Sequence, residues 1–63
     1  MTLQQIQTAF RDKIRVMIKG SDSYFEGIIV VYFPKRSGAF RCVVENDDGI
    51  LHIFNINQLE LIP

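Results

Sequence analysis

Two side chains of this 63-residue chain carry the chemistry most often used in catalytic and metal sites: one histidine and one cysteine. His52 is the only side chain that titrates near neutral pH without a perturbing environment. It lies in an alternating apolar segment with no second histidine, cysteine or carboxylate at metal-ligand spacing, so we expect no metal site within one chain. We interpret His52 as a structural histidine, unless a symmetry axis brings several copies of it together.

Cys42 alternates with Phe40 and Val44, which predicts a small apolar side chain buried in a core. A cysteine nucleophile would need a positioned base and an acid to orient that base. Glu45, Asp47 and Asp48 crowd a predicted hairpin tip. Paired catalytic carboxylates need burial to separate their pKa values, so we interpret these acids as a solvated turn. The residue types therefore predict no catalytic residue.

The segment Tyr32–Arg41 contains three cations and three aromatic rings and no acid. Small barrels hold single-stranded nucleic acid with stacking rings beside cations that pair with phosphates. The residues expected to bind are Lys35, Arg36, Phe40 and Arg41. The alternative is a basic loop beside core aromatics, because alternation turns at least one of the rings inward. A nearby acidic hairpin could also cancel the field of the cations.

The formal net charge is zero, which argues against a strongly basic nucleic-acid-binding domain. The charges are nevertheless unevenly distributed. Residues 1–44 carry all seven basic and three acidic side chains, whereas residues 45–63 carry four acidic and no basic ones. The first residues lack the form of a signal peptide, and the longest apolar run is too short to span a membrane. A cytoplasmic protein without a membrane segment is expected.

Hydrophobic periodicity predicts a short helix followed by five strands. Thr2 and Gln5 have the spacing of a capping box, and apolar residues recur at helical spacing over residues 2–11. From Ile14 the period changes to two, which is typical of strands. The strands expected after that change, each bounded by turn-forming residues, are 14–19, 24–33, 40–45, 50–54 and 59–62, with one 3₁₀ turn at 55–58.

The second of these strands, 24–33, is apolar on both faces, so something other than water should cover its second face. Gly27 is expected at a bulge or bend within it. Five short strands with a long second strand and a helical turn before the last one describe an SH3-like barrel. The sequence thus predicts one mostly β domain over residues 1–63, with a five-stranded SH3-like barrel at 13–62 preceded by a short N-terminal α-helix.

With the strands placed, residues 16–62 resemble the small plasmid-borne, trimethoprim-insensitive dihydrofolate reductases, which are built on an SH3-like barrel. The segments that carry the resemblance are Lys19, Phe25-Glu26-Gly27-Ile28-Ile29-Val30, Leu51-His52-Ile53-Phe54 and Gln58-Leu59-Glu60-Leu61-Ile62. Residues 35–38 and 43–49 also resemble a set of small bacterial proteins, and that resemblance implies no chemistry.

The resemblance implies a homotetramer whose central pore binds folate and NADPH together. It places His52, Ile53 and Phe54 at the pore positions, and Lys19 at the lysine that attracts anionic ligand tails. His52 replaces a glutamine of the family and Phe54 a tyrosine. An imidazole cannot copy both ends of an amide, and phenylalanine lacks the hydroxyl.

The leading hypothesis is a cytoplasmic, non-catalytic binding module without a cofactor. It is expected to form a homo-oligomer through the second apolar face of residues 28–33 or through its helix, and to contact nucleic acid or protein through the basic-aromatic segment. The alternative is a pore-type homotetrameric dihydrofolate reductase-like enzyme that uses NADPH through Lys19, His52, Ile53 and Phe54.

Overall fold

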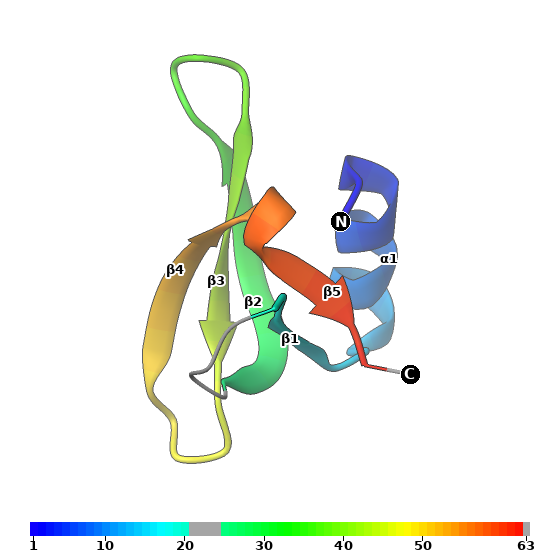
Figure 1. Ribbon diagram of the computed structural model, residues 1–63, viewed down its shortest axis with the longest axis vertical. Helices are drawn as coiled ribbons and strands as arrows, with labels where there is room; N and C mark the ends of the chain where they lie inside the picture. The colour runs from blue at the N-terminus through cyan, green and yellow to red at the C-terminus, as the bar shows by residue number, and fades with distance from the viewer. Residues whose placement is uncertain (21–24, 63) are drawn as a thin grey trace.

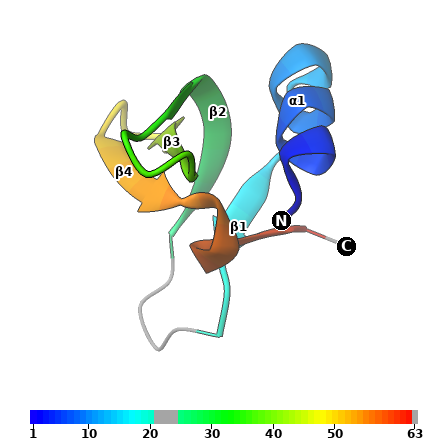
Figure 2. The same cartoon turned by 90° about the horizontal axis from the view of Figure 1, so that it is seen from above.

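One sheet of five antiparallel strands, in the order β4-β3-β2-β1-β5, carries a helix beside β2 (Figures 1 and 2). The computed structural model describes residues 1–20 and 25–62. Its elements are α1 Leu3–Asp12, β1 Val16–Ile18, β2 Glu26–Pro34, β3 Phe40–Glu45, β4 Leu51–Asn55, the 3₁₀ helix η1 Ile56–Gln58, and β5 Leu59–Leu61. The mostly β fold with an N-terminal helix is confirmed. Over the described ranges no ladder joins the edge strands β4 and β5, so the sheet is not closed.

The capping box predicted for the helix is present. The backbone N–H of Gln5 donates to Thr2 Oγ1 at 3.2 Å, and the backbone N–H of Thr2 donates to Gln5 Oε1 at 2.9 Å. These bonds satisfy two donors that the first turn of a helix otherwise leaves unpaired. The helix ends where Lys13 adopts a left-handed conformation (φ 58°) and its N–H donates to the carbonyl of Ala9. Its two fully buried residues are Ile6 and Ala9.

The core lies between α1 and one face of the sheet, which we call the inner face. Its buried residues come from the helix and all five strands: Ile6, Ala9, Val16, Ile29, Cys42, Val44, Phe54 and Leu59. The terminal ammonium of Met1 donates to the carbonyls of Ile56 and Leu59 at 2.8 and 3.1 Å, which holds the start of the chain against η1 and β5. No helix among the described residues is long and apolar enough to cross a membrane.

The bulge in β2 lies three residues beyond the predicted position. The β2–β3 register shifts between Ile29 and Val31, so Val30 is the extra residue. A bulge changes which side chains share a face: Ile29 and Tyr32 lie on the inner face, opposite Val44 and Cys42. The prediction of a bulge at Gly27 was therefore wrong in position, whereas a bend at Gly27 stays a prediction. The parts of the predicted second strand and first turn at 21–24 lie outside the described residues.

At Gly27 the backbones of β2 and β3 approach each other closely. It is buried, and a Cβ atom built on it would overlap the backbone carbonyl of Glu45 on β3. Backbone atoms cannot move aside as the end of a flexible side chain can. Glycine is therefore required here by the space available between β2 and β3.

We expect Gly27→Ala to lower the free energy of unfolding by about 1–3 kcal/mol, the usual cost of forcing an extra carbon into a packed site. Urea denaturation measures the change. Ser37→Ala, in the exposed turn between β2 and β3, is the control and should leave the midpoint unchanged. Equal midpoints for Gly27→Ala and the parent protein would contradict the close approach.

Candidate binding surface

The basic and acidic turns lie at opposite ends of the β2–β3–β4 part of the sheet. The turn after β2, residues 35–39, extends beyond the rest of the sheet at the top of Figure 1, and the turn after β3, residues 46–50, lies at the bottom. Charge that is uneven along the sequence is therefore also uneven in space. The acidic turn is too far away to cancel the field at the basic turn, because a six-residue strand of about 20 Å separates the two.

The basic turn is closed by its own backbone. The N–H of Lys35 donates to the carbonyl of Ala39 at 2.6 Å, and the N–H of Gly38 donates to the carbonyl of Lys35 at 2.9 Å. Gly38 has φ 92°, a conformation that side chains other than glycine rarely adopt. Arg36 is exposed and Lys35 half-buried, and no ion pair joins either of them to an acid within the part of the chain that is described.

Phe40 and Arg41, the other two predicted binding residues, lie on opposite faces of β3. Phe40 shares the inner side with Tyr32, whose ring centroid lies 6.3 Å away. Arg41 lies on the outer face, paired with Phe33, and its Nε donates to Asn55 Oδ1 at 3.1 Å. The structure brings the four predicted binding residues to one end of the sheet but not to one face. Of the three rings, two turn inward and one outward.

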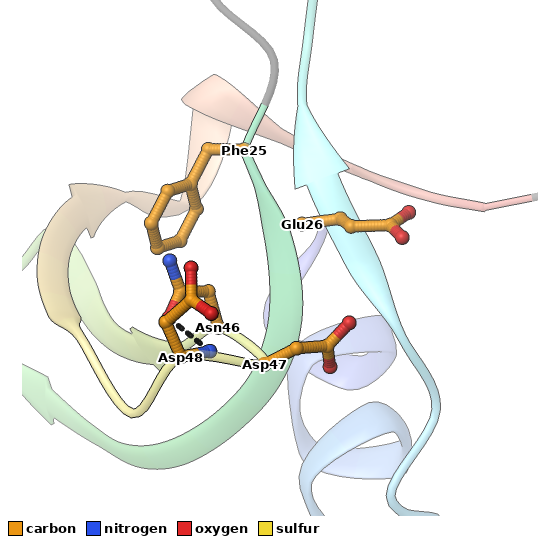
Figure 3. A pocket seen from close by; sticks show the side chains of 5 residues that line it. All are labelled: Phe25, Glu26, Asn46, Asp47 and Asp48. Atoms are coloured by element: carbon orange, nitrogen blue, oxygen red, sulfur yellow. Dashed lines mark hydrogen bonds between the residues drawn. The ribbon is translucent and has the colours of Figure 1, made fainter.

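At the opposite end, a shallow pocket is lined by Phe25, Glu26, Asn46, Asp47 and Asp48 (Figure 3). The carboxylates of Glu26 and Asp47 point away from Phe25 in this view. Both pair with the guanidinium of Arg15, at 3.0 and 3.1 Å, and the hydrogen bonds with Asp47 and then Glu26 raise the pKa of Arg15.

Asn46 holds the acidic turn in shape, because its Oδ1 accepts from the backbone N–H groups of Asp48 and Ile50. The side chain of Asp47 is 79% exposed, as a solvated turn predicts. Among the residues described, no group of histidine, cysteine and carboxylate side chains is arranged to hold a metal ion. Two of the three acids that line this pocket, Glu26 and Asp47, are engaged with Arg15.

The four residues of the reductase hypothesis do not share one surface of a single chain. His52 is exposed and packs against Phe25, with ring centroids 4.5 Å apart and ring planes inclined at 32°. Phe54 lies on the same face of β4 but is only 9% exposed, within the core. Ile53 is 56% exposed on the opposite face, and Lys19 follows β1, where its backbone N–H donates to the carbonyl of Gln58.

Comparison with protein-family models, with curated proteins and with solved structures found no match to this chain. The resemblance to dihydrofolate reductases therefore stays a prediction that rests on the residues quoted for it. The arguments below rest on this chain's own geometry.

The sequence predicted only part of a second surface, the apolar outer face of β2, β3 and β4. The apolar second face of residues 28–33 was recognised, but its neighbours Val43 and Ile53 were not assigned to it. In the structure Val31, Val43 and Ile53 are cross-strand partners on the outer face, away from the core. The signal available was the alternation in 40–45, where every second residue (Arg41, Val43, Glu45) falls opposite to buried Cys42 and Val44.

Cys42 is confirmed as a buried side chain, with no exposed area. Burial raises the pKa of its thiol from about 9 to about 11. Because the thiolate is the reactive form, we expect a disulfide reagent to modify Cys42 very slowly at neutral pH and rapidly after urea denaturation. Equal rates in the folded and unfolded protein would contradict the assignment.

The same shift predicts a pH dependence of stability. The unfolded chain loses the thiol proton near pH 9 and the folded chain near pH 11, so the contribution of the neutral thiol is complete below pH 9 and is lost as the pH rises through 11. The stability difference between the parent protein and Cys42→Ala should narrow over this interval. Other titrating groups are common to both proteins and cancel.

For the reductase hypothesis, we expect no NADPH oxidation with dihydrofolate in the presence of trimethoprim. Phe54 is held in the core and Ile53 lies on the other face of β4, so the chain does not present these residues together. Absorbance of NADPH measures the reaction. Turnover that is abolished by His52→Ala, but not by Lys35→Ala in the remote basic turn, would contradict this expectation.

Proposed function

We propose that this protein is a non-catalytic binding module on an SH3-like scaffold, and that it binds single-stranded nucleic acid at the β2–β3 hairpin. The observation that carries the proposal is the separation of the two charged turns. The cations at 35, 36 and 41 have no acid paired with them among the described residues, whereas the acids of the opposite turn are partly neutralised by Arg15.

The strand arrangement supports the SH3-like scaffold. The short strand β1 pairs with both β2 and β5, and the long strand β2 continues past its bulge to pair with β3. A 3₁₀ helix leads from β4 into β5. The long second strand and the helical turn before the last strand are features from which the barrel was predicted, although β4 and β5 are not joined over the described residues.

The chemistry of the hairpin suits a single strand better than a duplex. Lys35 and Arg36 stand at a projecting turn, where they offer two charges to successive phosphates. Phe40 is the ring nearest that turn and is only half-buried, so part of its face is open for a base to stack on. With so few cations, we expect modest affinity and a shallow salt dependence, because each phosphate contact to a single strand contributes only about 0.7 to the slope.

Fluorescence anisotropy of a labelled oligothymidylate tests the proposal. For Lys35→Gln/Arg36→Gln, the slope of log affinity against log salt should become shallower by about 1.4, because each phosphate contact to a single strand contributes about 0.7. Phe40→Leu should weaken binding by about 1 kcal/mol without changing the slope, because it removes stacking and no charge.

Lys19→Gln is the matched control, since Lys19 is also an exposed cation but follows β1, away from the hairpin. Circular dichroism shows whether each variant retains its fold. Binding lost equally in the Lys19 and hairpin variants would show non-specific attraction and overturn the site. Absence of any salt-sensitive binding by the parent protein would overturn the proposal and leave a protein ligand as the alternative for the same turn.

A further inference from the structure

The outer face of β2, β3 and β4 carries three rows of side chains that run across the strands. The middle row is Val31, Val43 and Ile53. Toward the basic turn lies the row Phe33, Arg41 and Asn55, and toward the acidic turn lies the row Ile28, Glu45 and Leu51. The middle row is entirely apolar. The β3 residue of each outer row is charged, and the two charges have opposite signs: Arg41 in one row and Glu45 in the other.

This face is apolar and open. Val31 is 44%, Ile53 56% and Leu51 57% exposed, because α1 and the core lie against the other side of the sheet. A sheet with one solvated face normally places polar side chains there. A contiguous group of exposed apolar side chains in the middle of a sheet marks an interaction surface.

We propose that a second copy of this chain covers the outer face, with a two-fold axis running along the middle row. Such an axis lies between the two sheets and perpendicular to the strands. It places Val43 against the partner's Val43 and reverses the strand direction, so that Arg41 faces the partner's Glu45. The contact is then made twice, as in every interface with two-fold symmetry.

Charge complementarity argues for this occupant and this orientation. Arg41 and Glu45 are four residues apart on one strand, about 13 Å, with Val43 midway between them. An axis parallel to the strands would instead place Arg41 on Arg41 and Glu45 on Glu45, which is repulsive. Rotation about the apolar middle row therefore brings each positive charge of this face against a negative charge of the other copy. A face with this property can bind a second copy of itself.

The guanidinium of Arg41 and the carboxylate of Glu45 can each form a further ion pair. The guanidinium of Arg41 donates to Asn55 through Nε, and no bond from its two Nη atoms occurs among the described residues. Glu45 is exposed and makes no ion pair within the same ranges. The same rotation brings the acidic end of each copy toward the basic end of the other, so the polarity of the whole sheet favours the same arrangement.

The homodimer rests on the outer face, to which Arg41 belongs. The nucleic-acid proposal is tested at Lys35 and Arg36, which lie in the turn after β2 and not on that face. Loss of binding by Lys35→Gln/Arg36→Gln with an unchanged dimer, or loss of the dimer with retained binding, would separate the two proposals.

Sedimentation equilibrium over a range of concentrations tests the dimer. Arg41→Glu and Glu45→Arg should each weaken association by about tenfold or more, since each creates two like-charge contacts. The double variant Arg41→Glu/Glu45→Arg should restore association to within a few-fold of the parent, because the pairs are re-formed with their signs exchanged. A parent protein that stays monomeric throughout, or a dimer insensitive to either single reversal, would overturn the proposal.

Cross-linking gives a second measurement that does not depend on the charge variants folding. In a Cys42→Ala background, Val43→Cys should form a disulfide-linked dimer under mild oxidation, because the axis brings the two copies of this position together. Leu61→Cys is the control, an exposed apolar position on β5 outside the face. Equal cross-linking of the two variants would show random collision and would also overturn the arrangement.

Discussion

The single irregularity in β2 determines which side chains meet the core and which meet solvent. β2 pairs with β1 at one end and β3 at the other, so its side-chain alternation must satisfy both ladders. With Val30 as an extra residue, Ile29 and Tyr32 both fall on the inner face although they are three positions apart. Without it, Tyr32 would turn outward, away from its edge-to-face contact with Phe10 of α1. The packing of the helix on the sheet therefore depends on this bulge.

The same constraint leaves the outer face apolar. A chain of 63 residues has one helix to cover its sheet, and α1 packs on the inner side, where Ile6 and Ala9 are fully buried. Val31 is then fixed on the other side, in line with Val43 and Ile53. Burial of this row would add apolar area that so small a chain cannot bury alone. The proposed association with a second copy would bury this row without a second helix.

Local signals predicted most of the fold. The capping box at Thr2 and Gln5, the apolar spacing of α1 and the alternation around Cys42 each depend on neighbours in sequence, and each is present in the structure. The position of the bulge could not be predicted, because a bulge at Gly27 and one at Val30 both fit an apolar strand. The extra residue at Val30 is visible only in the register between β2 and β3, which is a property of two strands and not of the sequence of one. Phe40 and Arg41 are neighbours in β3, so strand alternation places them at one end of the sheet but on opposite faces.

The chain has seven basic and seven acidic residues, and the proposed two-fold interface gives a physical reason for having both signs of charge on one surface. A strongly basic face would repel its own copy, so an interface with two-fold symmetry needs both signs on the same surface. β3 supplies them with Arg41 and Glu45 on either side of Val43. Cations outside the proposed interface need no acid beside them. The turn with Lys35 and Arg36 is outside it, because this turn extends beyond the end of the sheet. Zero net charge is therefore compatible with a local cationic site, because Asp47 and Asp48 lie at the other end of the β2–β3–β4 part of the sheet, where Asp47 is bound to Arg15.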